Sequence, residues 1–180
     1  MKTILLSGAH GVGKGFFLNK ISDDIQQYEV YSASKLIERY QLSTDSGYKK
    51  VSNVNNNQDV LITALKEAKL QSAKDVILDG HLCLFNADGE VERIPENFFI
   101  NAQIKGIVLL QDDSNIICDR INQRDAKKIS VTSIEKLQEE ERKYVEELHR
   151  KIQMGYKIIS HECTGREFEQ FLKEMGEYDE

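Results

Sequence analysis

Cysteine is scarce and scattered in this sequence, which holds three cysteines among 180 residues. Cys83, Cys118 and Cys163 are far apart and lack C-x-x-C spacing, which argues against a disulfide framework and favours reduced thiols. Long apolar runs are also missing, so we expect no membrane-spanning segment. We expect the first strand within a few residues of Met1, which leaves no room for a signal peptide. Together these features predict a cytoplasmic protein.

The sequence has no surplus of positive charge, because its net charge at pH 7 is −6. This balance argues against broad electrostatic binding to nucleic acid or to membranes. Internal repeats and low-complexity tails are absent as well. A chain of this length buries roughly 70% of its unfolded surface. We therefore expect a single domain, residues 1–180, built around one hydrophobic core.

Short apolar runs recur along the chain and have the composition of buried parallel strands. The runs are Thr3–Ser7, Val76–Leu78, Ile107–Leu110 and Tyr156–Ile159, with a weaker one near Glu29–Tyr31. Helical patterns separate these runs from one another. The alternation predicts an α/β fold in which helices cover both faces of a parallel sheet.

Capping residues mark several expected helix starts. Either Asp112 or Asp113 is expected to cap one helix. Capping boxes are expected at Thr132–Glu135 and Thr164–Glu167, because a Thr three residues before a Glu can satisfy the first free N–H groups. The acidic run Glu139–Glu141 is expected on the solvated face of the helix that follows the first box.

Two connections have the composition of loops. The polar segment 42–57 is rich in Asn and Ser, which predicts a long flexible connection before a helix near Asp59–Ser72. The segment Asn86–Glu90 is a turn signal between two short β-like runs, which predicts a hairpin.

The most informative pattern is Gly8-Ala9-His10-Gly11-Val12-Gly13-Lys14-Gly15, which follows an apolar run and leads into a helix-forming segment. A strand, a glycine-rich turn, a lysine and a helix in this order are typical of a phosphate-binding loop. Backbone N–H groups of such a loop surround phosphate oxygens, and its lysine reaches the outer phosphates. The alternative is a glycine-rich turn with a solvent-exposed lysine. The expected ATP-binding residues are consecutive: Gly8, Ala9, His10, Gly11, Val12, Gly13, Lys14, Gly15 and Phe16.

A carboxylate follows the second strong apolar run, Val76-Ile77-Leu78-Asp79. In phosphate-loop proteins such an Asp lies beside the loop and holds magnesium, usually through water. The usual Ser or Thr hydroxyl after the lysine is missing at Gly15, which gives Asp79 more importance. The alternative is that Asp79 caps or turns the chain before Gly80. The expected cofactor is therefore Mg²⁺ with ATP.

Arg120 and Arg124 are four residues apart in one expected helix, so they share a face. Mobile guanidinium groups are suited to stabilise the charge that develops in phosphoryl transfer. The alternative is that both are cations at a helix C-terminus. Ser34, Arg39 and His81 are candidate acceptor-binding residues, for which surface exposure or a structural hydrogen bond is an equal alternative.

These residues together resemble the nucleoside monophosphate kinase branch of the phosphate-loop kinases over most of the chain. Archaeal-type adenylate kinases and small AAA-like ATP-binding proteins look most similar. Gly8–Lys14 matches the phosphate loop, Asp79-Gly80-His81 matches the step after the carboxylate strand, and Arg120–Asp125 looks like the start of a lid. The resemblance implies the strand order 2-3-1-4-5. It also implies that the base of the nucleotide binds near His161–Thr164.

Two departures from the adenylate kinase pattern bear on activity. Common adenylate kinases also carry Gly after the lysine, but they then have Thr where this chain has Phe16. The segment Ser32–Tyr40 only loosely resembles the acceptor motif of that family. The hydroxyl is thus missing at both Gly15 and Phe16.

The leading hypothesis is an ATP-dependent phosphotransferase that moves the γ-phosphoryl group to a nucleotide or another small metabolite. Lys14 would bridge the outer phosphates, Asp79 would order the metal waters, and the two arginines would close over the transferred group. Mobile segments are expected at residues 41–57 on the acceptor side and at residues 124–132 in the lid. The second hypothesis is an ATP-binding regulatory protein with weak or no kinase activity and a protein partner.

Overall fold

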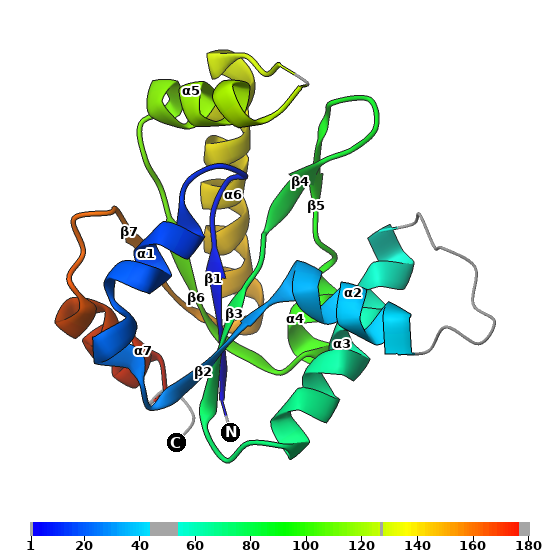
Figure 1. Ribbon diagram of the computed structural model, residues 1–180, viewed down its shortest axis with the longest axis vertical. Coiled ribbons are helices and arrows are strands. Elements are labelled where there is room, and N and C mark those ends of the chain that lie inside the picture. Colours follow the sequence, from blue (N-terminus) through cyan, green and yellow to red (C-terminus); the bar gives the residue numbers. More distant parts are fainter. Residues whose placement is uncertain (1, 44–53, 127, 177–180) are drawn as a thin grey trace.

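Five parallel strands form one sheet in the computed structural model, which describes residues 2–43, 54–126 and 128–176. The strands are β1 (Thr3–Ser7), β2 (Tyr28–Ser32), β3 (Asp75–Asp79), β6 (Ile104–Leu110) and β7 (Gly155–Ile159). Their order across the sheet is β2-β3-β1-β6-β7 (Figure 1). Numbered along this sheet alone, that order is 2-3-1-4-5, so the expected α/β fold and strand order are confirmed.

Helices flank the sheet (Figure 1). They are α1 (Lys14–Lys20), the 3₁₀ helix η1 (Ser22–Ile25), α2 (Ala33–Ser43), α3 (Val54–Leu70), α4 (Glu96–Asn101), α5 (Ser114–Arg124), α6 (Val131–Ile152) and α7 (Gly165–Gly176). Helix α7 packs against β6, β7 and η1, whereas α6 packs against β6, β7 and the hairpin described below. Among the helices of the described residues, none is long and apolar enough to cross a membrane.

The central strands owe their place to continuous apolar sequence. Every residue of β1 is buried, and the last five residues of β6 are buried as well. Strands covered by helices on both faces need such unbroken apolar runs rather than alternating ones. Thr3 and Ser7, at the two ends of β1, are the polar residues buried in this strand.

A two-stranded hairpin leaves the main sheet, as the turn signal indicated. Strand β4 (Cys83–Phe85) pairs with the antiparallel strand β5 (Val91–Arg93). The Asn86 side chain closes the turn by accepting hydrogen bonds from the N–H groups of Asp88 and Glu90 at 3.0 and 2.9 Å. Helix α6 packs against both strands and anchors the hairpin to the domain.

Two of the expected helix caps form. Asp113 caps α5 by accepting hydrogen bonds from the N–H groups of Asn115 and Ile116. In the box before α7, the N–H of Thr164 donates to Glu167 at 2.8 Å, and the N–H of Glu167 donates to the Thr164 hydroxyl at 3.3 Å.

The expected box at Thr132–Glu135 is wrong. Helix α6 starts at Val131, and Ser130 caps it by accepting a hydrogen bond from the N–H of Ser133 at 3.1 Å. Ser130 has an extended backbone, so its hydroxyl reaches the first turn before that of Thr132, which already lies inside the helix.

The prediction that the acidic run lies on the solvated face of α6 is wrong at one residue. Glu139 is exposed, but Glu141 has no exposed surface. Glu141 lies four residues after Leu137 and three before Tyr144, which are both buried, so helical periodicity places it on the apolar stripe.

The expected long connection is shorter than the polar composition indicated. Helix α2 continues to Ser43 and α3 begins at Val54, so both ends of the segment 42–57 are helical. Residues 44–53 and residue 127 lie outside the described residues. Mobility of the segments 41–57 and 124–132 stays a prediction.

Candidate active site

The glycine-rich segment forms a loop between β1 and α1, at the carboxyl end of the central strand. Gly11 and Gly13 have φ angles of 82° and 96°, which side-chain-bearing residues rarely adopt. The N–H of Val12 donates to the Ala9 carbonyl at 3.0 Å and tightens the turn. The glycines thus give the compact curve that the sequence pattern predicted.

Close packing also requires glycine in this loop. A Cβ on Gly8 would lie 2.5 Å from the backbone oxygen of Leu110, and one on Gly11 would lie 2.5 Å from the Ile121 side chain. In contrast, a Cβ on Gly15 would meet no atom within 4 Å. The first two glycines are therefore fixed by their surroundings, whereas the position of Gly15 tolerates a side chain.

A cavity of about 400 Å³ opens beside the loop. Its lining residues come from the loop, the end of β2, the end of β3 and helix α5: Ala9, His10, Gly11, Gly13, Lys14, Gly15, Ser32, Ala33, Ser34, Asp79, His81, Arg120 and Arg124. The carboxyl ends of adjacent parallel strands meet here, which is where ligands bind in open α/β sheets.

Most of the site residues expected from the sequence come together at this cavity. Four do not line it: Gly8 and Val12 are buried, Phe16 is 71% exposed, and Arg39 is exposed on α2. Ser32 and Ala33 line it although the sequence analysis did not single them out. Their signal is positional, because Ser32 ends the weak strand β2 and Ala33 begins the next helix.

Lys14 lies at the centre of the polar contacts in the cavity. Its Nζ donates to the Gly8 carbonyl at 3.1 Å, lies 3.1 Å from Nε2 of His81 and lies 3.6 Å from Oδ1 of Asp79. Burial lowers the pKa of Lys14, and the negative charges of Asp79 and Glu141 oppose that shift. Lys14 is therefore a buried side chain, not the solvent-exposed lysine of the alternative interpretation.

The two partners of Lys14 have pKa values shifted by the same environment. Burial raises the pKa of Asp79, while the ammonium of Lys14 opposes the shift. Burial, followed by the positive charges of Lys14 and His10, lowers the pKa of His81 to about 3. His81 is therefore neutral near pH 7, and its Nε2 accepts the hydrogen bond from Lys14.

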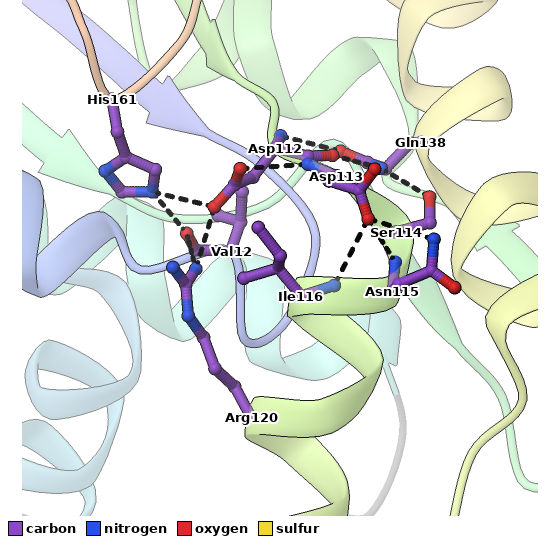
Figure 2. Close-up of polar contacts among 9 residues, drawn as sticks. All are labelled: Val12, Asp112, Asp113, Ser114, Asn115, Ile116, Arg120, Gln138 and His161. Atoms are coloured by element: carbon purple, nitrogen blue, oxygen red, sulfur yellow. Dashed lines mark hydrogen bonds and ion pairs between the residues drawn. The ribbon is translucent and has the colours of Figure 1, made fainter.

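Arg120 belongs to a polar cluster beneath the loop (Figure 2). Its Nη1 donates to the Val12 carbonyl at 3.1 Å and to Oδ2 of Asp112 at 2.9 Å. His161 reaches the same carbonyl with Nε2 at 2.6 Å. Gln138 fixes the backbone of Asp112 through two hydrogen bonds of 3.0 and 3.2 Å. The cluster joins the loop to α5, α6 and the segment after β7.

Arg124 is held at the rim of the cavity, next to the loop. It donates to Asp125 at 2.7 and 3.0 Å, and its Nη2 lies 2.5 Å from Nε2 of His10. The His10 ring therefore contacts the second arginine. Both arginines line the cavity and have protein partners that a phosphate oxygen can replace.

A magnesium ion fits this cavity only if the phosphates supply part of its ligands. No group of three or more His, Cys, Asp or Glu residues suited to a metal ion occurs in the part of the chain that the structure describes. Asp79 offers a partly exposed carboxylate at the cavity wall. Magnesium keeps several waters and commonly takes one or two carboxylates plus substrate phosphates, so this arrangement is compatible with it.

Glu141 also lies near the site and was not predicted to do so from the sequence. Its Oε1 accepts a hydrogen bond from the hydroxyl of Ser7, the residue directly before the loop, at 3.3 Å. Burial raises the pKa of this carboxyl to about 8, and Lys14 opposes the shift. The only signal in the sequence is its place on the apolar stripe of α6.

The strand order and the glycine-rich loop after the first strand together define a phosphate-loop nucleotide-binding fold. The family comparison specifies the class further. The chain belongs to the AAA domain family, whose model matches residues 7–138. A search of curated proteins found no match.

Solved structures share this fold at low sequence identity. The tunicamycin resistance protein of Deinococcus radiodurans has a TM-score of 0.59 and 14% identity, covering 97% of this chain and 95% of that one. A sugar kinase from Janibacter sp. HTCC2649 has a TM-score of 0.50 and 12% identity, covering 97% and 91%. At these identities the similarity concerns the fold, and the nucleoside monophosphate kinase branch stays a prediction.

Proposed function

We propose that the protein is an ATP-dependent phosphotransferase that acts on a small-molecule acceptor. The observation that carries the proposal is the convergence of Lys14, Asp79, Arg120 and Arg124 on one cavity beside the phosphate loop. Three separate segments supply these charges. Phosphoryl transfer depends chiefly on positioning and on charge stabilisation, which such a set of side chains provides.

In this proposal, the loop N–H groups and Lys14 bind the phosphates of ATP. Lys14 exchanges its contacts with Gly8 and His81 for oxygens of the outer phosphates, and Asp79 orders the metal waters. Bound magnesium would supply charge neutralisation between the phosphates. An acceptor oxygen forms a bond to the γ-phosphorus while the bond from that phosphorus to the bridging oxygen of ADP breaks.

The two arginines and the end of β2 would complete the proposed site. Arg120 and Arg124 would leave their carboxylate partners and neutralise the transferred group as the lid closes. Ser34 and His81 would contact the acceptor, together with Ser32. Arg39 lies on the exposed side of α2 and would contribute only after a movement of that helix.

The adenine or guanine base would lie near the segment 161–164. His161 contacts the rings of Phe16 and Phe17 edge-on, with centroids 6.2 Å apart in each case. Phe16 thus offers an exposed aromatic surface beside this segment. The acceptor in this proposal is a nucleotide or another small phosphorylated or hydroxylated metabolite.

We expect phosphoryl transfer from radiolabelled ATP to at least one member of a panel of nucleoside monophosphates, nucleosides and small hydroxylated metabolites. ATP binding is first established by a rise in melting temperature. Bound ATP without any labelled acceptor would contradict the transferase and favour the regulatory protein. A partner that binds in one nucleotide state alone would then support that second function, which the missing hydroxyls at Gly15 and Phe16 favour.

A hydroxyl at position 15 should strengthen metal-dependent binding. In Gly15→Ser the new side chain enters open space, because no atom lies within 4 Å of the added Cβ. The hydroxyl supplies the magnesium ligand that phosphate loops usually provide. We expect a lower ATP dissociation constant with magnesium and little change without it, measured by calorimetry. Gly15→Ala is the matched control, and an equal effect of both variants would contradict this explanation.

A further inference from the structure

Glu141 is a fully buried carboxyl group directly under the phosphate loop. It projects from the middle of α6 and has no exposed surface. Its Oε1 accepts a single side-chain hydrogen bond, from Ser7, and its Oε2 has no hydrogen-bond partner within the described residues. A buried carboxylate with so few partners is costly in its charged form, so the site favours a protonated carboxyl.

Lys14 is the charged group that acts most strongly on Glu141. Among the influences on the Glu141 carboxyl, burial disfavours the charge, while Lys14, the Ser7 hydroxyl and the backbone of Leu82 and Cys83 favour it. Both side chains reach the end of β1, because Lys14 donates to the Gly8 carbonyl at 3.1 Å and Glu141 accepts from Ser7, the preceding residue, at 3.3 Å. Lys14 also lies 3.6 Å from Asp79, so two carboxyl groups act on the same ammonium group.

The other titratable groups around Glu141 remain in one charge state near pH 8. On β4, burial raises the pKa of the Cys83 thiol to about 12, so this thiol is neutral. Tyr144 of α6 donates a hydrogen bond to the Ile94 carbonyl, and burial raises the pKa of its hydroxyl to about 12. Arg93 of β5 is paired with Glu140 and Glu147 at 2.7 Å each, nearer the surface.

We propose that Glu141 is a positioning residue for Lys14 and that it takes up a proton when ATP binds to the loop. The proposal rests on the ATP site proposed above. A charged Glu141 draws Lys14 into the protein, whereas a neutral one leaves Lys14 free to reach the outer phosphates. The bound phosphates add negative charge near Glu141. The ammonium group of Lys14, once it has moved to the phosphates, also stabilises the negative charge of Glu141 less. Both changes favour the protonated carboxyl.

ATP affinity should therefore fall as the pH rises through the range in which Glu141 ionises. The carboxyl, with a pKa near 8, is mostly protonated at pH 7 and mostly ionised at pH 9. The ionised fraction must take up a proton before or during binding. We expect the ATP dissociation constant to increase about tenfold between pH 7 and pH 9, the factor that one coupled proton gives over this window.

Calorimetry of the full chain with Mg²⁺ and a non-hydrolysable ATP analogue tests this coupling. Titrations at pH 8 in two buffers of different ionisation enthalpy give the number of protons exchanged. We expect roughly half a proton taken up by the wild type, because half of Glu141 is ionised there. Glu141→Gln keeps the size and the acceptor oxygen for Ser7 but cannot ionise, so its uptake and its pH dependence should be largely lost.

Glu139→Gln is the matched control, because Glu139 lies on the same helix, is exposed and pairs with Lys143 of the next turn at 2.7 Å. It should behave as the wild type. Lys14 is present in both variants, and the loss of the Glu141 charge lowers the pKa of Lys14 further, so proton uptake at Lys14 itself would persist in Glu141→Gln. A merely structural role of Glu141 would change the affinity at all pH values alike and leave the proton count unchanged.

The possible outcomes separate this proposal from the ATP site itself. A wild type that does not bind the analogue overturns the proposed ATP site and this coupling together. Binding with the same proton uptake in wild type and Glu141→Gln overturns the coupling alone. If Glu141→Gln fails to fold, Ser7→Ala decides, because it removes a hydrogen bond that favours the ionised Glu141. A maximum of proton uptake at higher pH than in the wild type supports the proposal, and an unmoved maximum overturns it.

Discussion

Replacing Lys14 by methionine should abolish the stabilisation of the protein by ATP. ATP at about 100 times its dissociation constant stabilises a folded protein by about 2.7 kcal/mol. For a domain of this size this free energy corresponds to a rise of roughly 5–10 °C in melting temperature. Without the ammonium group, the outer phosphates lose the charged donor at the centre of the cavity. We therefore expect no measurable rise with Lys14→Met.

The same substitution should reduce phosphoryl transfer roughly 100- to 1000-fold, the usual effect of removing one donor to a transition-state oxygen. Methionine keeps most of the buried aliphatic volume of Lys14, which is 8% exposed. The shift caused by ATP is measured against the melting temperature of each variant without nucleotide, so a change in basal stability does not enter it.

Lys66→Met on α3 is a control for the loss of one positive charge, because Lys66 is exposed and outside the cavity lining. It should retain both the ATP-induced shift and the activity. An undiminished ATP shift in Lys14→Met would contradict the phosphate loop assignment, whatever the acceptor is.

Local patterns in the sequence were sufficient to predict the residues at the strand ends that line the site. The loop glycines follow β1 directly and Asp79 ends β3, and parallel strands bring such ends to one edge of a sheet. The position of these residues at the ends of predicted strands was therefore enough to predict that they lie close together. The hairpin and the cap of α7 were predictable for the same reason, since the residues that form them lie within a few positions of one another.

Contacts between distant segments were not predictable from these patterns. Glu141 was assigned to solvent because it continues an acidic run, and its burial follows only from the packing of α6 under the loop. The bond from His161 to the Val12 carbonyl joins residues 149 positions apart. Resemblance to adenylate kinases placed His161 near a site for the nucleotide base, yet its contact with the loop backbone depends on how the segment after β7 lies against the loop.

The prediction of the residue that caps α6 was wrong for a more local reason. Ser130 and Thr132 are both capping residues in type, and the Thr132 spacing to Glu135 is that of a box. The capping residue is the one whose backbone is still extended where the helix begins. In this protein that residue is Ser130, and Thr132 is already helical.

Replacing Gly8 by alanine should destabilise the whole domain, in contrast to the same change at Gly15. The added methyl group of Gly8→Ala would lie 2.5 Å from the backbone oxygen of Leu110 and 3.0 Å from Val12. The Leu110 oxygen belongs to β6, which pairs with β1 in the centre of the sheet, so it cannot move away without disturbing that pairing. The strain at the φ of 154° adds to the clash.

We expect a loss of about 2–4 kcal/mol in the free energy of unfolding for Gly8→Ala, from backbone strain and overpacking combined. For a domain of this size the melting temperature should fall by roughly 5–15 °C. Gly15→Ala adds the same methyl group to the same loop in open space and should stay within a degree or two of the wild type. Thermal unfolding followed by circular dichroism without nucleotide compares the two variants.

The comparison also separates the two functions of glycine in this loop. If conformational freedom of the unfolded chain dominated, both alanine variants would be stabilised to a similar extent, because alanine restricts the unfolded state in the same way at either position. A loss of stability in Gly8→Ala alone means that the close approach of Gly8 to β6 decides the outcome. The ATP-induced shift should be lost in Gly8→Ala as well, since the carbonyl of Gly8 that receives Lys14 moves with the loop.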